Sequence, residues 1–291
     1  MTEKGISVSN NLGLKFIALL SIVRWYNILL TVLAQYLSAY VLLEHDGAGI
    51  WGVVKDWKLH AIVLASVFSI AGGYIVNNFY DFEKDLINRP STTLFNETVK
   101  RQTTLNFYLL FNTIATIVAF SASFKIGVFF VLFIMALWVY SHKVQRIPFI
   151  KEFAASILSI TCFFAVMLHF SSFYPFAFIY GAFFMTLVYC RELVKQFINF
   201  TGDKALNIQS IPVSLGIDKA KSFTVFMMVL SFLSGLSILF YYGLEQRNYF
   251  ILIAIITVAS SMYLMQKNRF GTINTCYKIL IVAGILNILW V

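Results

Sequence analysis

The chain has 291 residues, of which 59% are hydrophobic and only 12% are charged. A soluble domain typically carries about 25% charged residues, and one core could not hide this much apolar surface from water. The composition therefore excludes an ordinary soluble globular protein, a disordered chain and a nucleic-acid-binding domain, and it indicates an all-α, polytopic membrane protein. In such a protein the net charge of +9 points first to topology, because cytoplasmic loops collect Lys and Arg.

Nine runs of the chain are long and apolar enough to cross a membrane as helices, which need about 20 mostly apolar residues. In chain order they cover residues 14–43, 58–80, 103–122, 124–141, 153–171, 173–194, 221–243, 248–266 and 271–291. The connections after the third and fifth spans are very short, which predicts that the helices on either side pair as hairpins. We therefore expect a bundle of nine transmembrane helices.

Basic residues divide unevenly between the two sets of loops that nine spans create. One set and its flanking residues hold 17 Lys and Arg, whereas the other holds only Lys55, Lys58, Lys125 and Arg247. The positive-inside rule then predicts a cytoplasmic N-terminus and a C-terminus on the outside. One missed or extra span would mix the two sets, so the imbalance also supports the number nine. A composition leaning toward Phe, Ile, Asn and Lys favours a bacterial inner membrane.

The first polar cluster closes the second span, and ionisable residues at such a place tend to mark function. Asn77, Asp81 and Asp85 stand at positions i, i+4 and i+8, so on a helix they project from one face. Two carboxylates one turn apart repel each other, and a cation between them removes that repulsion. Mg²⁺ commonly takes one or two carboxylates and completes its shell with phosphate oxygens and water. The spacing predicts a magnesium site; a solvated helix end is the alternative interpretation.

A second polar cluster repeats this spacing after the sixth span. Asn199, Asp203 and Asn207 again stand at i, i+4 and i+8, and each cluster ends a span at the same side of the membrane. The repetition predicts a duplicated four-helix unit within one domain spanning residues 1–291, with quasi-repeats over residues 14–141 and 153–266 around a central cavity. Two polar helix ends that face each other would form a metal-rich pocket open to the cytoplasm.

Basic and hydrogen-bonding side chains surround both clusters. They are Arg24 and Asn27 in the first span, Tyr140, Lys143 and Arg146 around the end of the fourth, and Arg191, Glu192 and Lys195 at the end of the sixth. Acidic oxygens and several cations at one membrane face suit a polyanion that is carried in with Mg²⁺, and a diphosphate fits this description. Topology alone explains Lys143 and Arg146 equally well, but a charge such as Arg24 within a span is costly unless it faces a cavity.

Taken in order, these motifs resemble those of the UbiA-type intramembrane prenyltransferases, and the resemblance covers nearly the whole chain. The segments that carry it are Arg24-xx-Asn27, Asn77-xxx-Asp81-xxx-Asp85, Tyr140-Ser141 with Lys143 and Arg146, Arg191-Glu192-Leu193-Val194-Lys195, Gly202-Asp203-Lys204, and Ile211-Pro212-Val213-Ser214-Leu215-Gly216. The motif sequences are most similar to those of the geranylgeranylglyceryl-phosphate geranylgeranyltransferase branch. The chain departs from the family where Gln196 and Asn199 replace carboxylates, and where Ser91-Thr92-Thr93-Leu94 replaces a second Arg-Pro.

The resemblance implies a Mg²⁺-dependent transfer of a prenyl group from a prenyl diphosphate to a lipophilic acceptor within the membrane, here an isoprenoid-glycerol phosphate. It implies two groups of metal ligands, Asn77, Asp81 and Asp85 in one and Gln196, Asn199 and Asp203 in the other. Asp81, Asp85 and Asp203 are the expected catalytic residues. The substrate-binding residues would be Arg24, Asn27, Tyr140, Lys143, Arg146, Arg191, Glu192 and Lys195. The expected partners are the two substrates and the lipid bilayer, with no nucleic acid.

Other functions stay open at this point. The acceptor could instead be aromatic, as in quinone, haem or chlorophyll pathways. A degenerate relative without activity is a further alternative, because Gln196 and Asn199 lack the charge of a carboxylate. A transporter would be favoured by helices that Gly or Pro interrupts at the bilayer midplane. All four prolines of this chain, however, lie in predicted loops.

Overall fold

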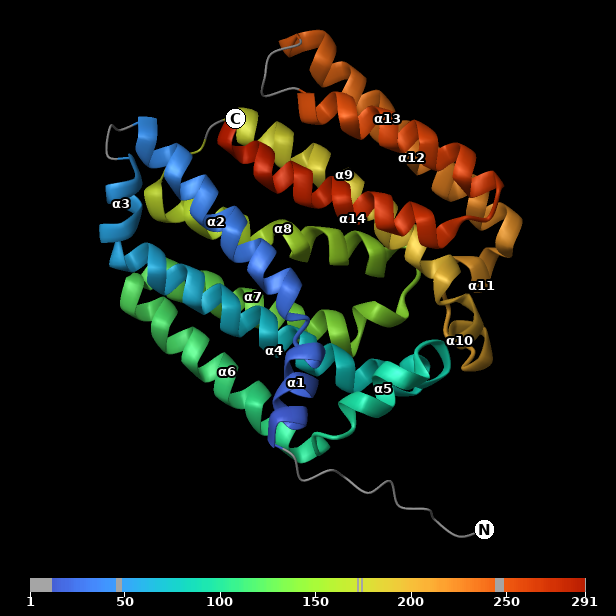
Figure 1. Ribbon diagram of the computed structural model, residues 1–291, viewed down its shortest axis with the longest axis horizontal. Coiled ribbons are helices and arrows are strands. Elements are labelled where there is room, and N and C mark those ends of the chain that lie inside the picture. Colours follow the sequence, from blue (N-terminus) through green and yellow to red (C-terminus); the bar gives the residue numbers. More distant parts are fainter. Residues whose placement is uncertain (1–11, 46–48, 172, 174, 244–248, 291) are drawn as a thin grey trace.

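The computed structural model describes residues 12–45, 49–171, 173, 175–243 and 249–290, and all regular structure in these ranges is helical (Figure 1). The long helices are α1 (Leu12–Ile22), α2 (Trp25–His45), α4 (Trp57–Asn88), α6 (Arg101–Ala122), α7 (Phe124–His142), α8 (Ile150–Phe170), α9 (Pro175–Ile198), α12 (Ile217–Tyr242), α13 (Tyr249–Gln266) and α14 (Phe270–Leu286). Short helical turns are α3 (Gly49–Lys55), α5 (Pro90–Asn96), η1 (Val144–Arg146), α10 (Phe200–Ala205), α11 (Ile211–Leu215) and η3 (Asn287–Trp290).

The long helices confirm the predicted spans. Within the described ranges, eight single helices are long and apolar enough to cross a membrane, and the bent pair α1–α2 makes a ninth if it is counted as one span. Their outer faces are apolar: the side chains of Ile117, Leu132 and Phe240 are 64%, 60% and 94% exposed. Such surfaces are stable against hydrocarbon because each helix satisfies its own backbone hydrogen bonds. The chain is an integral, multi-pass membrane protein.

The first span differs from its prediction as one continuous helix. α1 and α2 meet at an angle of 57°, and Arg24 lies at the break with a φ of 51°. This left-handed backbone conformation is unfavourable for a residue with a Cβ, and it cannot continue a right-handed helix. The break lies where the first span carries its one charged motif, so Arg24 sits at a helix junction and not in the middle of a helix.

Six helices form a closed ring. α2 contacts α4, and the sequence of contacts continues through α7, α8, α9 and α14 back to α2. α6 packs outside α4 and α7, while α12 and α13 pack outside α9 and α14, as Figure 1 shows. In the apolar 18-residue stretch of α4, 67% of the residues are buried inside the protein, against 17% in that of α6. α4 is therefore a central element of the bundle, and the face that it turns inward is available for a site.

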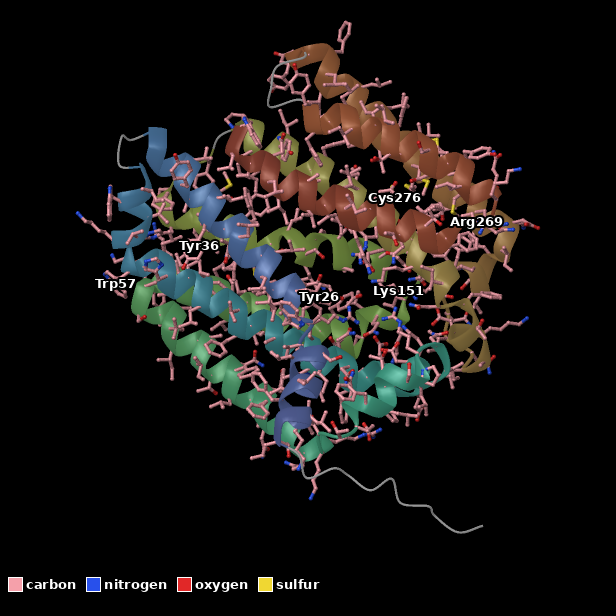
Figure 2. All side chains as sticks on the ribbon, in the orientation of Figure 1. Tyr26, Tyr36, Trp57, Lys151, Arg269 and Cys276 are labelled. Carbon is pink, nitrogen blue, oxygen red and sulfur yellow. The ribbon has the colours of Figure 1, made fainter. Side chains whose placement is uncertain are left out.

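Small residues let α4 approach its neighbour closely. A Cβ added to Gly72 would lie 2.7 Å from the side-chain oxygen of Asn112 on α6, so a larger residue there would push the helices apart. Figure 2 shows a charged side chain inside this packed assembly: Lys151 lies among the helices, whereas Trp57 lies at the edge. Lys151 is only 6% exposed. A buried ammonium group is unfavourable without compensating oxygens, which directs attention to the interior of the ring.

Candidate functional site

The first polar cluster lies on one face of a continuous helix, as its spacing predicts. α4 begins after Asp56, whose carboxylate accepts a hydrogen bond from the backbone of Leu59, and it runs through the whole cluster to Asn88. Asn77, Asp81 and Asp85 all line a cavity inside the ring of helices. Because the three positions lie one turn apart, the helix presents three oxygen-bearing side chains to the same space.

Asp81 is the most heavily bonded member of this cluster. Its carboxylate accepts a hydrogen bond of 2.8 Å from the Asn77 amide and another from the side chain of Gln145, and it forms an ion pair of 3.3 Å with Lys84. Gln145 comes from η1, 64 residues further along the chain. Asp81 therefore ties α4 to the segment after α7, and its orientation is fixed before any substrate arrives.

The second polar cluster has a different structure. α9 ends at Ile198, Asn199 stands between α9 and α10, and Asn207 lies beyond α10 with a φ of 53°. Gln196 and Asn199 line the cavity, but Asp203 does not; it is 1% exposed and lies 3.9 Å from the Lys84 ammonium. The repeated spacing in the sequence thus does not produce a repeated helix face, because the helix is interrupted inside the second cluster.

Asp203 lies outside the long helices in a protected position. Burial raises the pKa of its carboxyl above the ordinary value of 3.8, and the positive charges of Lys84 and Lys151 offset part of that rise. The two clusters are also joined by Asn88, whose amide donates to the Asn199 carbonyl (3.3 Å) and accepts from the Gly202 backbone N–H (3.0 Å). A Cβ on Gly202 would lie 2.4 Å from the Asn88 amide nitrogen, so this close approach requires glycine.

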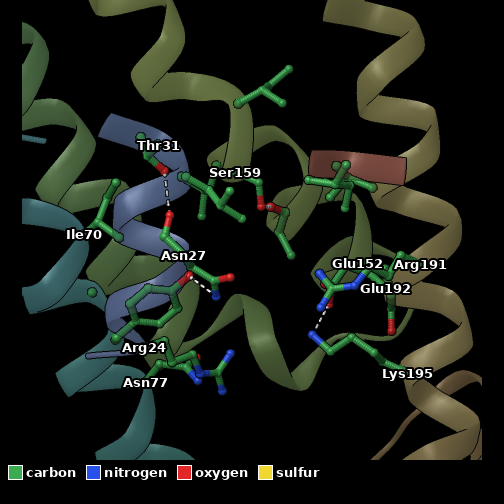
Figure 3. Close-up of a pocket in the computed structure, with 18 of the residues that line it drawn as sticks. Arg24, Asn27, Thr31, Ile70, Asn77, Glu152, Ser159, Arg191, Glu192 and Lys195 are labelled. Carbon is green, nitrogen blue, oxygen red and sulfur yellow. Dashed lines mark hydrogen bonds and ion pairs between the residues drawn. The ribbon is translucent and has the colours of Figure 1, made fainter. Parts of the chain in front are cut away.

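Two groups of polar side chains face each other across the cavity in Figure 3. In one, the Asn27 amide donates to the Tyr74 hydroxyl at 3.0 Å, and the Arg24 guanidinium carbon lies 5.2 Å from the centre of the Tyr74 ring. In the other, the Lys195 ammonium lies 2.6 Å from a Glu192 oxygen, and the Arg191 guanidinium donates to Asn274 of α14 at 3.1 Å. The cations of both groups are held by neighbours of their own.

The cavity has a volume of about 470 Å³ and changes character along its length. Several helices contribute polar residues at one end and apolar residues farther on. On α8, for example, Lys151 and Glu152 are followed by Leu158 and Phe163, and on α9 the apolar Phe184 comes before the polar Arg191. Along α4 the lining runs from Ile70 to Asp85, which corresponds to roughly 22 Å of helix. The cavity can therefore hold an amphiphilic molecule with its charged part at one end.

The charge of the lining favours an anion. Among the described residues, seven cationic side chains line the cavity against four carboxylates. The cations are Arg24, Lys84, Arg89, Lys151, Arg191, Lys195 and Lys278, and the carboxylates are Asp81, Asp85, Glu152 and Glu192. Positive charge in a low-dielectric enclosure attracts an anion more strongly than the same charge at a water-exposed surface.

The structure brings most of the predicted site residues together in this cavity. Those that line it are Arg24, Asn27, Asn77, Asp81, Asp85, Tyr140, Arg191, Glu192, Lys195, Gln196 and Asn199. Three predicted residues do not line it, namely Lys143, Arg146 and Asp203. Lys143 and Arg146 are exposed on the segment around η1, because α7 ends at His142 and the turn that follows directs only Gln145 inward. Asp203 lies outside the cavity lining, 3.9 Å from the ammonium of the lining residue Lys84.

Several lining residues were missed in the sequence, above all Lys84, Gln145, Lys151 and Glu152. Lys84 lies between Asp81 and Asp85, and its i, i+3 spacing from Asp81 was an available signal. Lys151 and Glu152 immediately precede a predicted span, where charged residues are ordinary, so the sequence offered no comparable signal. Glu152 is 1% exposed, and both of its carboxylate oxygens are buried without a hydrogen-bond donor. One of them forms an ion pair of 3.7 Å with the Lys151 ammonium.

A membrane-embedded ring of helices around an amphiphilic, cation-rich cavity defines a protein that handles a lipid-like anion within the bilayer. A model of the UbiA prenyltransferase family matches residues 32–285, which is most of the chain. The chain belongs to the UbiA prenyltransferase family, and it is a prenyltransferase.

Curated relatives of the chain include two digeranylgeranylglyceryl phosphate synthases. The protein from Methanosphaera stadtmanae is 26% identical over 216 residues, which cover 72% of this chain and 78% of the relative. The protein from Thermococcus gammatolerans is 28% identical over 228 residues, which cover 73% of this chain and 74% of the relative. Both organisms are archaeal.

Solved structures share the fold over nearly the whole chain. A structure described as that of digeranylgeranylglyceryl phosphate synthase in membranes has a TM-score of 0.67 at 18% identity and covers 95% of this chain and 99% of its own. A UbiA homolog from Archaeoglobus fulgidus bound to GPP and Mg²⁺ has a TM-score of 0.66 at 13% identity, with coverages of 94% and 100%. At these identities the likeness concerns the fold.

Proposed function

We propose that this prenyltransferase moves a geranylgeranyl group from geranylgeranyl diphosphate to the free hydroxyl of geranylgeranylglyceryl phosphate. The observation that carries the proposal is the gradient along the cavity, from Asp81, Lys84 and Lys195 at one end to Phe163 and Phe184 at the other. A prenyl diphosphate has the same two halves, an anionic head and an apolar tail. The acceptor is supported by the curated relatives, which are named digeranylgeranylglyceryl phosphate synthases.

The diphosphate end of the cavity suits one Mg²⁺. Asp81 and Asp85 offer acceptor oxygens one helical turn apart and Asn77 offers an amide oxygen, which is the hard donor set that this ion prefers. A bound Mg²⁺ would supply positive charge to the leaving diphosphate as its bond to carbon weakens. The chain's own cations act in the same direction: Arg24 and Lys195 lie on opposite walls and can neutralise the diphosphate from two sides (Figure 3).

The acceptor hydroxyl loses a proton when its oxygen forms the new bond to the prenyl carbon and the diphosphate leaves. Glu152 is suited to receive that proton, because its buried carboxylate lines the cavity and both oxygens lack a hydrogen-bond donor. A buried carboxylate in this state is unfavourable until a donor arrives. Glu152→Gln should therefore lower kcat at least tenfold while leaving the KM for prenyl diphosphate nearly unchanged. Equal loss in kcat and in prenyl diphosphate affinity would contradict this role.

The overall proposal is tested with purified protein in lipid nanodiscs. Radiolabelled geranylgeranyl diphosphate and Mg²⁺ are supplied with geranylgeranylglyceryl phosphate, with an aromatic acid acceptor, or with no acceptor. We expect labelled diether lipid with the first acceptor only. If the label appears in the aromatic product instead, the acceptor is aromatic and the proposed acceptor is wrong. If no acceptor gives a labelled product, prenyl transfer by this chain is contradicted.

The orientation follows from the charge of the loops. We propose a cytoplasmic N-terminus, which puts the polar end of the cavity at the cytoplasmic face. The relatives are archaeal and lend no support to a bacterial inner membrane, so that part stays a prediction. Single cysteines are introduced in place of Lys143 or Lys125, and intact cells are treated with a membrane-impermeant thiol reagent. We expect reaction only at position 125; reaction only at position 143 would mean that the orientation is reversed.

A further inference from the structure

A lysine ammonium lies between the two polar clusters. Lys84 is 3.3 Å from a carboxylate oxygen of Asp81 in the first cluster and 3.9 Å from a carboxylate oxygen of Asp203 in the second. The Lys84 side chain is 14% exposed, and the Asp203 side chain is 1% exposed. The contact with Asp81 is an ordinary helical neighbour pair, but Asp203 is 119 residues away in sequence, so the bridge depends on the fold. One positive charge thus joins the acidic residues of two distant segments.

The second cluster is poor in charge for a divalent metal. Gln196 and Asn199 are neutral, so Asp203 is the one carboxylate of the second cluster, against two in the first. Buried oxygens of Gln196, Asn199 and Asp203 nevertheless have no hydrogen-bond donor. Acceptor oxygens that lack donors attract a cation, and the Lys84 ammonium lies 3.9 Å from the Asp203 oxygen among them.

The protein itself holds this arrangement together. Asn88, one turn beyond Lys84, is bonded to the backbone of both Asn199 and Gly202, and the absence of a side chain at Gly202 permits that contact. The distance between the clusters is therefore set by protein groups on α4 and α10. Lys84, on the same helix as Asn88, is paired with Asp81 and Asp203 and lines the cavity at its diphosphate end.

We propose that the Lys84 ammonium is the second cationic centre of the site and takes the place of a second divalent metal, so that this chain binds one metal ion with each prenyl diphosphate. The inference rests on the proposed binding of a prenyl diphosphate. Lys84 lines the cavity and is available to a diphosphate there, while Asp203, which does not line it, lies 3.9 Å from the ammonium. Neutral side chains at positions 196 and 199 are consistent with this role of Lys84, because carboxylates there would attract a divalent ion to the position that the ammonium occupies.

Metal counting tests the inference apart from catalysis. Mn²⁺ is titrated into the full chain in nanodiscs with the unreactive thiolo analogue of geranylgeranyl diphosphate, and bound Mn²⁺ is counted by electron paramagnetic resonance. We expect one Mn²⁺ per wild-type chain, and two in the folded variant Lys84→Met/Gln196→Asp/Asn199→Asp. Two ions bound to the wild type would overturn the inference, and so would a single ion in the triple variant.

Affinity for the analogue supplies a second measurement. Lys84→Met should weaken binding of the thiolo analogue at least tenfold, Lys84→Arg should restore most of it, and Lys219→Met, at an exposed position outside the cavity, should leave it unchanged. Wild-type affinity in Lys84→Met would overturn the role of Lys84. The proposed function fails separately: a wild type that transfers prenyl groups with two bound metals contradicts only the inference, whereas a wild type that forms no labelled product contradicts prenyl transfer.

Discussion

The two polar clusters share a spacing in the sequence but have different structures. The first lies on an unbroken helix, and Asn77, Asp81 and Asp85 all reach the cavity. The second is interrupted at Asn199, and its one carboxylate, Asp203, does not line the cavity but lies 3.9 Å from the Lys84 ammonium. Equal spacing therefore guarantees a common face only while the helix continues. We propose that residues 14–141 and 153–266 are quasi-repeats in which the two clusters have diverged toward different tasks.

The difference suggests a division of labour. The first cluster supplies the negative charge that a Mg²⁺ would need, whereas the second supplies neutral oxygens and a buried counter-charge for a lysine. Lys84 lies within the first cluster in the sequence, but its ammonium pairs with carboxylates of both clusters. On this view the catalytic importance of an aspartate depends on whether it faces the cavity, and substitutions in the two clusters should have unequal effects.

The largest effect is expected in the first cluster. Asp81→Asn removes a charge from the proposed metal ligands and weakens the hold on Lys84, so prenyl transfer should fall about a hundred- to a thousandfold. The measurement is the initial rate of radiolabelled lipid formation. Glu83→Gln is the matched control, because Glu83 is exposed on the same helix and does not line the cavity. Comparable losses in both variants would remove the special role of the cavity face.

A smaller effect is expected in the second cluster. Asp203→Asn keeps the shape of the side chain but removes the charge behind Lys84, so the rate should fall roughly tenfold, equivalent to about 1.4 kcal/mol of transition-state stabilisation. In a Lys84→Met background the same substitution should cost little more, because its partner is already gone. A loss as large as that in Asp81→Asn, independent of Lys84, would show that Asp203 acts directly on the substrate.

The contact between the clusters should contribute to both stability and activity. Gly202→Ala places a methyl group against the Asn88 amide, and such overpacking typically costs about 1–3 kcal/mol. We expect a lower midpoint of thermal unfolding and a several-fold lower rate. Asn88→Ala removes the obstructing group, so the double variant should be less destabilised than the sum of the single variants. Additive losses would indicate that the two residues do not contact each other.

The sequence predicted the spans and the face of the first cluster well, because hydrophobic run length and helical periodicity are local properties. The sequence predicted that Arg24 lies within a continuous span. The break at Arg24 depends on a left-handed backbone conformation, which the residues of the first span do not reveal. The sequence missed Lys151 and Glu152 because charged residues at the start of a span are ordinary, and only the fold shows that these two lie inside the ring. The pairing of Lys84 with Asp203 joins residues far apart in the chain and was equally hidden.

The smallest effect is expected at the other end of α4, away from both clusters. Burial alone would raise the pKa of Asp56, but hydrogen bonds from the His169 ring (2.8 Å) and the Leu59 backbone outweigh it and lower that pKa below the ordinary 3.8. A lowered carboxyl pKa stabilises the folded state above the ordinary value, and this stabilisation disappears as the pH falls through the folded-state pKa. Asp56→Asn keeps a good helix cap but removes the charged acceptor of the His169 hydrogen bond, so it should cost about 1 kcal/mol or less at neutral pH. Thermal unfolding between about pH 6 and about pH 3 should show a flatter acid dependence in the variant than in the wild type, with prenyl transfer unchanged. If the variant lost activity as Asp81→Asn does, the distinction between a catalytic and a structural end of α4 would fail.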